Sequence, residues 1–379
     1  MTVQDTLAEL VAFPTVCKTP NEDLIVFVEE QLEPLGFRIT KFPGEVGRLS
    51  LLASIGPETD DGVVFSAHSD VVPVEGQPWT SDPFQLKSVD SKLVARGTSD
   101  MKGFLACMLE AAKHAAKHVE QLKRPIHLAV SYDEEIGCVG VRSLLAHLQS
   151  QGFKAGGCII GEPTEMEQII GHKGKLAVEV QCTGLSAHSS NPARGCNAVL
   201  LACDLVQEVQ ALQADLTVSL LDDRYEVPHS TAQVGVFRGG VALNIVPDRC
   251  DFQFEMRLLA GSDAASYVER IRTRAAQLVQ EKYPQGTVSV TELNGYPGLD
   301  TPETSAFAQS LTKQFVRRGT KRINYGTEGG LFQEYLGLPV VVCGPGSIDR
   351  AHKADEWVLP NELDESVAFL NSVIDQCLA

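Results

Sequence analysis

The chain has 379 residues and a formal net charge of −17 at pH 7, from 49 Asp and Glu against 32 Lys and Arg, and this length predicts two domains because it exceeds what one hydrophobic core usually supports. The acidic balance excludes a protein that binds nucleic acid, because the protein would repel a phosphate backbone. The apolar runs are too short to span a bilayer, and the first segment lacks a charged and apolar leader. The cysteines form no C-x-x-C pair. These features predict a cytoplasmic protein without membrane contact.

Predicted helices and strands alternate through the first part of the chain. Helices are predicted over 2–11, 21–35 and 104–118, and strands over 37–42, 49–53 and from Val63 onward. The turn-rich segment 73–83, with Trp79, is placed to form one wall of a cleft. In the helix over 104–118, His114 and His118 have the spacing of a metal pair, although histidines are also favoured near a helix C-terminus. The alternation predicts an α/β fold, with a mostly parallel mixed sheet that carries helices on both faces.

The pattern changes at Lys175, where apolar and polar residues begin to alternate along a strand. Strands over 176–182, 232–237, 250–258 and 288–291 are interleaved with helices over 197–212 and 263–282. Their order, β-α-β-β-α-β, is typical of a ferredoxin-like α+β domain. The α/β pattern then resumes, with helices over 302–317 and 361–377 and a strand that ends at Cys343. We therefore predict a main α/β domain over 1–173 and 295–379 with an inserted domain over 174–294.

Acidic or imidazole side chains follow the apolar runs that are predicted as strands of the main sheet. They are His68, Asp70, Asp133, Glu134, Glu135, Glu162 and His352, together with Asp100 before the helix over 104–118. In an open α/β sheet, ligand sites gather beyond the carboxyl ends of the strands. We therefore expect these side chains to meet at one edge of the sheet.

Each of these residues also has an ordinary interpretation. A His-x-Asp pair such as His68 and Asp70 is often a hydrogen-bonded turn, Asp100 suits a helix N-cap, and 133–135 suits a solvated turn. Several carboxylates at one edge, however, need compensating positive charge, which a pair of divalent cations supplies. In that case His68 binds a cation, while Asp70 accepts the proton on its other ring nitrogen and fixes the tautomer.

Several segments resemble the dizinc aminoacylase and carboxypeptidase family of metallopeptidases, in the same order and along nearly the whole chain. They are 64–70, 97–103, 133–135, 161–164 and the C-terminal His352. The resemblance implies a catalytic domain of the zinc-exopeptidase type, with an inserted lid domain through which a homodimer forms. Within the family, the segments 171–174, 186–195, 324–328 and 344–352 resemble members that act on N2-acetyl-L-ornithine. The two glycines after Glu328 depart from that pattern and leave the contour of the substrate pocket open.

The resemblance also implies ligands for two divalent metal ions. Asp100 bridges the two ions. His68 and Glu162 complete one site. Glu135 and His352 complete the other. Nitrogen and carboxylate ligands suit zinc, with cobalt as the alternative, and the peptide bond between Asp100 and Met101 is expected to be cis.

Further residues receive catalytic and substrate-binding roles from the same resemblance. Glu134 is the general base, which takes a proton from the metal-bridging water and returns it to the leaving amine. His188, in the inserted domain, stabilises the oxyanion, from the same or a neighbouring subunit. Arg257 clamps the α-carboxylate of the substrate, or alternatively is a cross-strand partner for a neighbouring acid. Asn244 adds a hydrogen bond to the substrate, and Glu328 pairs with its distal ammonium.

The implied reaction is hydrolysis of N2-acetyl-L-ornithine to L-ornithine and acetate, a step of arginine biosynthesis. The same metal chemistry would also serve the removal of a succinyl group from succinyl-diaminopimelate, or a broad aminoacylase. A catalytically silent binding protein on this fold is a different class, and the intact Glu134 and five intact ligands argue against it. The expected partner is therefore a small N-acyl amino acid.

Overall fold

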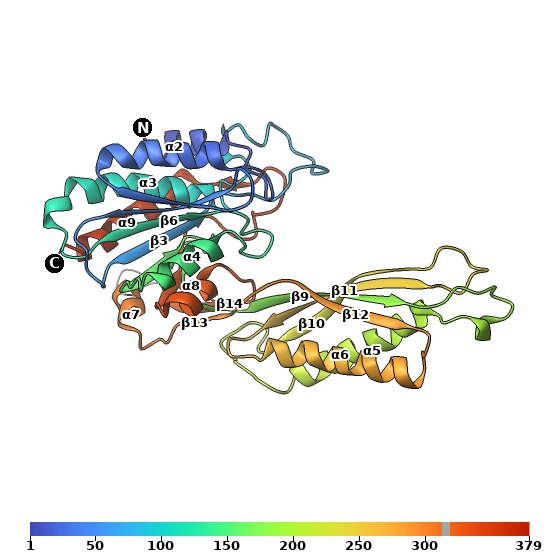
Figure 1. Ribbon diagram of the computed structural model, residues 1–379. Helices are drawn as coiled ribbons and strands as arrows, with labels where there is room; N and C mark the ends of the chain where they lie inside the picture. Colours follow the sequence, from blue (N-terminus) through green and yellow to red (C-terminus); the bar gives the residue numbers. More distant parts are fainter. Residues whose placement is uncertain (313–318, 379) are drawn as a thin grey trace. The chain divides into compact units, whose positions relative to one another are not determined.

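The computed structural model describes residues 1–312 and 319–378, and the chain divides into two compact units (Figure 1). Unit 1 comprises Met1–Gly171, Leu299–Arg322 and Thr327–Ala379. Unit 2 comprises His172–Gly298 and Ile323–Gly326. Unit 2 therefore interrupts the sequence of unit 1.

Unit 1 is built on a mixed sheet with the strand order β1-β2-β6-β3-β7-β15-β8-β13, in which β14 also pairs with β8. These strands are β1 (Arg38–Pro43), β2 (Leu49–Ile55), β3 (Val63–His68), β6 (Ile126–Ser131), β7 (Gly157–Ile160), β8 (Gln168–His172), β13 (Leu299–Asp300), β14 (Thr320–Ile323) and β15 (Val340–Val342). A separate small sheet contains β4 (Lys87–Val89), β5 (Lys92–Val94) and β16 (Trp357–Val358).

The centre of the main sheet is parallel. β3 pairs in parallel with β6 and β7, and β7 pairs in parallel with β15. Every residue of β3 and of β6 is buried, as expected for strands covered on both faces. The parallel pairing places His68 opposite Ser131 and Ile160 opposite Val342. The predicted α/β fold is confirmed, and the four strands end at the same edge of the sheet.

Helices cover both faces of this sheet. They are α1 (Val3–Val11), α2 (Glu22–Leu32), α3 (Lys102–Lys117), α4 (Val141–Ser150), α7 (Ala306–Thr312), α8 (Gly329–Leu336) and α9 (Pro360–Gln376), with 3-10 turns η1 (Glu33–Leu35) and η2 (Val119–Gln121). In Figure 1, α2, α3 and α9 lie on one face, and α4 and α8 lie on the other. The α3 side chains Phe104, Leu105 and Met108 are fully buried in the core of unit 1, because they recur at helical spacing.

Some predicted boundaries shift for local reasons. The helix predicted over 21–35 ends as α2 at Leu32, because Pro34 lacks the N–H that would continue it, and η1 follows. The helix predicted over 302–317 begins as α7 at Ala306, and residues 313–317 of that prediction lie outside the described residues. The helices α4 and α8 and the strands β4, β5, β8, β13, β14 and β16 are additions to the predicted set.

Unit 2 is an antiparallel sheet with helices packed against it. Its strands are β9 (Gly174–Thr183), β10 (Thr231–Gly239), β11 (Arg249–Leu258) and β12 (Thr287–Tyr296), and its helices are α5 (Ala198–Leu216), α6 (Ala264–Glu281) and the 3-10 turn η3 (Pro192–Arg194). The strand order is β10-β11-β9-β12. In β11, buried and partly exposed residues alternate, because one face of the sheet contributes Phe252 and Phe254 to a core shared with α5 and α6. The chain order confirms the predicted ferredoxin-like arrangement.

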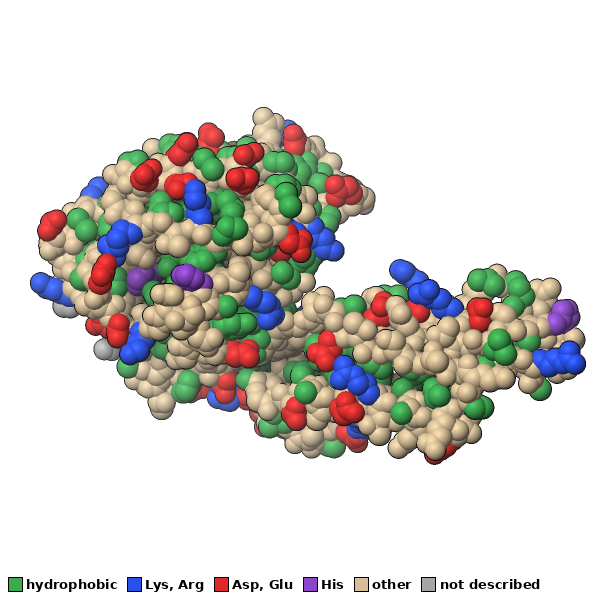
Figure 2. Space-filling view, in the orientation of Figure 1, with side chains coloured by type: hydrophobic (Ala, Val, Ile, Leu, Met, Phe, Trp, Pro, Cys, Tyr) green, Lys and Arg blue, Asp and Glu red, His purple; other side chains and the backbone are tan. Residues whose placement is uncertain are grey.

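The surface carries charges of both signs. Figure 2 shows acidic and basic side chains interspersed with apolar ones on the visible face. On this face, the acidic side chains are therefore spread out rather than gathered into one patch. Of the helices in the described part of the chain, none has both the length and the apolar character that crossing a membrane requires.

Gly161, which follows β7, has no room for a side chain. A Cβ atom at Gly161 would lie 1.9 Å from Cδ1 of Phe104, a fully buried residue of α3. We predict that Gly161→Ala lowers the free energy of unfolding by about 1–3 kcal/mol in urea titrations, the usual range for an overpacked core. Gly235→Ala is the control, because the nearest atom to a Cβ there, Nε2 of Gln233, is 3.9 Å away. Equal stability of the two variants would contradict this prediction.

Candidate metal centre

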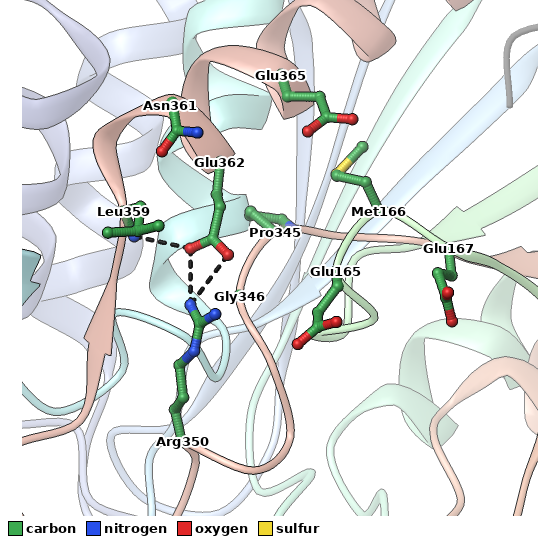
Figure 3. A pocket seen from close by; sticks show the side chains of 10 residues that line it. All are labelled: Glu165, Met166, Glu167, Pro345, Gly346, Arg350, Leu359, Asn361, Glu362 and Glu365. Atoms are coloured by element: carbon green, nitrogen blue, oxygen red, sulfur yellow. Dashed lines mark hydrogen bonds and ion pairs between the residues drawn. The ribbon is translucent and has the colours of Figure 1, made fainter. Parts of the chain in front are cut away.

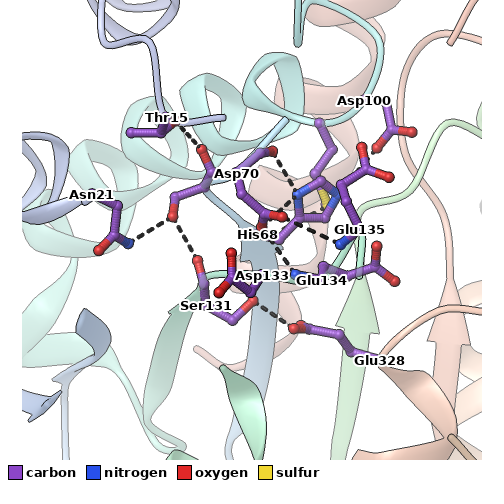
Figure 4. Close-up of polar contacts among 12 residues, drawn as sticks. Thr15, Asn21, His68, Asp70, Asp100, Ser131, Asp133, Glu134, Glu135 and Glu328 are labelled. Atoms are coloured by element: carbon purple, nitrogen blue, oxygen red, sulfur yellow. Dashed lines mark hydrogen bonds and ion pairs between the residues drawn. The ribbon is translucent and has the colours of Figure 1, made fainter. Parts of the chain in front are cut away.

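The strand ends and the loop before α3 bring the candidate metal ligands together (Figure 4). Nε2 of His68 lies 3.1 Å from Oδ1 of Asp100 and 3.8 Å from Oε1 of Glu162. Nε2 of His352 lies 3.2 Å from Oδ2 of Asp100 and 3.0 Å from Oε2 of Glu135. Asp100 therefore faces two imidazoles, one with each carboxylate oxygen, and the predicted cis peptide bond after it is present.

His68 is oriented by the residue that follows it two positions later. Its Nδ1 lies 2.9 Å from the backbone oxygen of Asp70 and 3.5 Å from the carboxylate Oδ1 of Asp70. Because a carbonyl oxygen only accepts, Nδ1 donates its proton, and Nε2 is left to face Asp100. The Asp70 carboxylate accepts the backbone N–H groups of Glu134 at 3.1 Å and Glu135 at 3.2 Å. Asp70 therefore links β3 to the turn after β6 that contains Asp133, Glu134 and Glu135, here called the acidic turn.

The acidic turn after β6 is fixed by its first residue. Asp133 has a φ of 52°, in the left-handed region that non-glycine residues rarely adopt. Its buried carboxylate accepts the backbone N–H of Lys18 at 2.6 Å and a hydrogen bond from the guanidinium of Arg48. Next to it, Glu134 Oε1 accepts a hydrogen bond from the thiol of Cys138 at 3.2 Å. The side chains that flank Glu134 thus hold the turn in one conformation.

Burial disfavours the charged forms of the acids of this centre. It raises the pKa of Glu134 to about 8 and that of Glu135 to about 7, and neighbouring carboxylates add to both effects. The pKa of Glu162 is also raised, by burial and by the charge of Asp100. Burial opposes the charged form of His68, but hydrogen bonds to Asp100 and Asp70 raise its pKa above the ordinary value. These directions show that the centre favours added positive charge.

The donor atoms fit a pair of divalent cations. Among the described residues, ligand atoms lie within 4.8 Å of one another in two sets, His68 with Asp100 and Glu135, and His68 with Glu134 and Glu162. Imidazole and carboxylate donors are those that zinc prefers in catalytic sites. The imidazole of His352, whose side chain is 49% exposed, adds a further donor beside Asp100 and Glu135.

Glu328 lies inside unit 1, just before α8. It is 1% exposed, and its carboxylate accepts hydrogen bonds from Oγ of Ser131 at 2.5 Å and Oγ of Ser66 at 3.5 Å (Figure 4). Burial raises the pKa of Glu328 to about 7. Because Ser66 belongs to β3 and Ser131 to β6, this carboxylate joins the two strands that carry His68 and the acidic turn.

Three predicted site residues belong to unit 2 and are described within it. Nδ1 of His188 accepts the backbone N–H of Ser190 at 3.1 Å, and the adjacent Ser189 donates its N–H to the backbone oxygen of Asn244 at 3.1 Å. His188 and Asn244 therefore lie on neighbouring segments. The guanidinium of Arg257 donates to Glu255, which lies on the same strand β11, at 2.7 Å and to the hydroxyl of Tyr296 at 3.1 Å.

His114 of α3 and His118, which directly follows α3, lie outside the candidate metal centre. Nε2 of His114 is 2.7 Å from Oδ1 of Asp375, and the rings of His114 and His118 are 4.8 Å apart. Among the described residues, neither belongs to a set of metal donors. The favourable position of imidazoles near a helix C-terminus accounts for the pair.

A second hollow of unit 1, between the loop after β15 and the start of α9, contains no predicted site residue (Figure 3). Glu165, Met166, Glu167, Pro345, Gly346, Arg350, Leu359, Asn361, Glu362 and Glu365 line it. Arg350 donates to both carboxylate oxygens of Glu362, at 3.0 and 2.8 Å. Glu362 also accepts the backbone N–H of Leu359 at 2.7 Å, so it already serves as a structural partner at the start of α9.

Some residues that contact the candidate ligands or the acidic turn were not singled out by any sequence pattern. Glu356 accepts the backbone N–H of Asp100, and Arg48 pairs with Asp133. The partners are 256 and 85 positions apart in the chain, so no local spacing reveals them. The sequence offered two signals for such contacts, each a charged residue beside a motif. Arg96 directly precedes the motif that begins at Gly97, and Glu356 shortly follows His352.

Comparison with known proteins agrees with this geometry. The sequence model of a family described as "Peptidase family M20/M25/M40" matches residues 64–376. An acetylornithine deacetylase from Yersinia pseudotuberculosis is 33% identical over 362 residues, which cover 94% of this chain and 90% of that protein. This match confirms the resemblance inferred from the sequence motifs.

Solved structures share the fold. The M20 family metallo-carboxypeptidase Sso-CP2 from Sulfolobus solfataricus superposes with a TM-score of 0.80 at 20% identity, covering 99% of both chains. A dinuclear metal-binding peptidase of the M20 family from Bacillus subtilis superposes with a TM-score of 0.70 at 14% identity, covering 99% of this chain and 96% of that chain. Since the family model spans more than half of the chain and the deacetylase nearly all of it, this chain belongs to peptidase family M20/M25/M40.

Proposed function

We propose that this chain hydrolyses N2-acetyl-L-ornithine to L-ornithine and acetate. Membership of peptidase family M20/M25/M40 and likeness to a deacetylase support metal-dependent hydrolysis of an amide bond. The observation that carries the proposal is Asp100, which lies between the imidazoles of His68 and His352, with Glu134 beside His68. The substrate is inferred from the relative of Yersinia pseudotuberculosis. A role in arginine biosynthesis, in the cytoplasm, is part of the same proposal and rests on that substrate alone.

The proposed cofactor is a pair of zinc ions, with cobalt as the alternative. Asp100 would be the shared ligand, because its two oxygens face different imidazoles. His68 and Glu162 would hold one ion. Glu135 and His352 would hold the other. The nitrogen and oxygen donors support zinc, although metal availability also decides which ion is bound.

The proposed chemistry depends on a base beside the metal ligands. Divalent cations, when bound, lower the pKa of water and polarise a carbonyl group. The carboxylate of Glu134 accepts the proton of the attacking water, whose oxygen forms the new bond to the acetyl carbon. As the C–N bond breaks, Glu134 returns the proton to the leaving nitrogen. The thiol of Cys138 donates a hydrogen bond to Oε1 of Glu134. This leaves Oε2 to accept the proton and to return it.

Residues of unit 2 are proposed to bind the substrate. His188 would donate a hydrogen bond to the oxyanion, Arg257 would pair with the α-carboxylate, and Asn244 would add a hydrogen bond. Each is polar, and Arg257 keeps a guanidinium partly exposed beside Glu255. A homodimer formed through unit 2 is part of the same proposal, and the edge strands β10 and β12 of its sheet offer surfaces for it.

Glu328 is proposed to act within unit 1. Its burial and its hydrogen bonds to Ser131 and Ser66 support a role in fixing the strand ends, rather than the expected pairing with the distal ammonium of the substrate. Another residue would then recognise that ammonium group.

Glu134→Gln is expected to abolish most of the activity while leaving the metal ions bound. The amide cannot accept the proton of water, so kcat should fall by about 100-fold to 10,000-fold, the usual contribution of a general base. Zinc content by atomic emission should match the wild type. Glu120→Gln, at an exposed acid of η2, is the control and should keep full activity. Full turnover in Glu134→Gln would refute the proposed base.

The acyl group and side chain of the substrate are tested with a panel of amides. We expect kcat/KM to be highest for N2-acetyl-L-ornithine, compared with its formyl and succinyl analogues and with N-acetyl amino acids that lack a distal ammonium. A metal-loaded, folded protein that ignores acetylornithine but cleaves another acyl amino acid quickly would disprove the substrate. Preference for succinyl-diaminopimelate would instead assign the desuccinylase activity.

The stability of the metal-free protein is expected to decrease as pH rises from about 5 to about 8. Burial raises the pKa of Glu134 to about 8, so the folded protein holds protons that the unfolded chain, with a carboxyl pKa near 4.5, has released. Stability falls with pH wherever the folded state binds more protons. The pKa of His352, raised to about 11 by hydrogen bonds to Asp100 and Glu135, acts in the same direction.

Urea unfolding at several pH values, with and without zinc, measures this effect. Bound cations replace the protons, so the decrease should largely disappear in the loaded protein. Stability of the metal-free protein that increases between about pH 5 and 8 would contradict the charge balance described for the centre.

A further inference from the structure

A buried ion pair supports the backbone that carries Asp100. Arg96 and Glu356 are each 1% exposed, and Nη1 of Arg96 lies 2.7 Å from Oε2 of Glu356. The other oxygen of Glu356 accepts the backbone N–H groups of Ser99 at 2.8 Å and Asp100 at 3.0 Å. Glu356 therefore holds the peptide units that lead into the side chain of Asp100.

The same guanidinium is connected to His352 through Gln77. Oε1 of Gln77 accepts hydrogen bonds from Nη2 of Arg96 and from the indole N–H of Trp79, the latter at 3.1 Å. Since Oε1 is the acceptor, the amide nitrogen is free to donate, and it donates to the backbone oxygen of His352 at 3.0 Å. The ring of Trp79 lies over the guanidinium at 5.0 Å. A continuous chain of contacts thus joins the backbones of two candidate ligands.

His352 needs such support more than the other ligands. It lies outside helices and strands, has a φ of 61°, and exposes 49% of its side chain. A non-glycine residue in the left-handed region persists only where its surroundings enforce it. His68, by contrast, lies at the end of a buried strand and is held by the backbone oxygen of Asp70.

Stability alone does not explain the ion pair. A buried salt bridge can often be replaced by apolar residues without loss of stability, because desolvation of the two charges offsets their attraction. Nε of Arg96 is buried without a hydrogen-bond partner in the described part of the chain, which adds a further cost. The benefit must therefore lie in what the pair holds, and it holds Asp100 and His352.

We propose that Arg96, Glu356 and Gln77 form a brace that positions Asp100 and His352 for metal binding. The inference rests on the metal centre proposed above. Among the described residues, the brace makes hydrogen bonds to His352 and Asp100 but to neither Glu162 nor His68. Its main effect is therefore on the ion held by Asp100, Glu135 and His352, and the ion held by His68 and Glu162 is affected less.

Gln77 offers the sharpest test, because it is only partly buried and its replacement leaves the Arg96–Glu356 pair intact. Gln77→Glu keeps an acceptor for Arg96 and Trp79 but removes the donor to His352. Gln77→Ala removes all three hydrogen bonds, to Arg96, Trp79 and His352. Thr80→Ala is the control, because Thr80 lies in the same loop and bonds Asp355 at 3.0 Å, outside the brace.

The readout is the affinity for each of two zinc ions, measured on the full chain by competition with a chelator, and zinc content after dialysis. We expect both Gln77 variants to bind one ion about 10-fold to 100-fold more weakly, the usual effect of removing a group that orients a ligand. The other ion should bind almost as in the wild type, and Thr80→Ala should match the wild type for both.

The outcomes separate the brace from the proposed function. Wild-type protein that binds two zinc ions, with both Gln77 variants unchanged, would overturn the brace and leave the metal centre standing. Equal weakening of both ions in Gln77→Glu, with a lower thermal midpoint of the metal-free protein, would also overturn it, since Gln77 would then act through general stability. Wild-type protein that binds no zinc would overturn the metal centre, and the brace with it.

Discussion

The contact of three buried carboxylates with two imidazoles is the constraint on which unit 1 depends. Asp100, Glu135 and Glu162 cannot all be ionised in a closed site unless positive charge accompanies them. In the described residues, their ion pairs are made with His68 and His352. The parallel centre of the sheet makes this arrangement possible, because its strands end at one edge and bring the candidate ligands there.

The ligands are held mainly through the backbone rather than through their side chains. Asp70 accepts the N–H groups of the acidic turn, and Glu356 accepts that of Asp100. Such bonds leave the ligand oxygens free to face the centre, and they still fix where each side chain begins. A second layer of buried acids therefore supports the first, and each of these acids has hydrogen-bond donors that compensate for its burial.

The fold was largely predictable from the sequence, because buried strands and amphipathic strands have different periodicities. The continuous apolar run that ends at His68 predicted a central strand, and the alternation after Lys175 predicted the ferredoxin-like unit. The contacts that support the centre were not predictable, since Glu356 and Asp100 are 256 positions apart. The role assigned to Asp70 shows the same limit. Its sequence position suggested a partner for His68, whereas the structure adds backbone contacts to Glu134 and Glu135.

The protonation of Glu134 connects the energetics of the centre to its proposed chemistry. A general base works best when its pKa lies near the working pH, because it must both accept and release a proton. Burial and neighbouring carboxylates raise the pKa of Glu134 to about 8, and nearby cations would lower it. A bound cation would therefore oppose the effect of burial on the pKa of Glu134. Burial thus gives the carboxylate of Glu134 a higher affinity for a proton than an exposed carboxylate has, as the proposed general base requires.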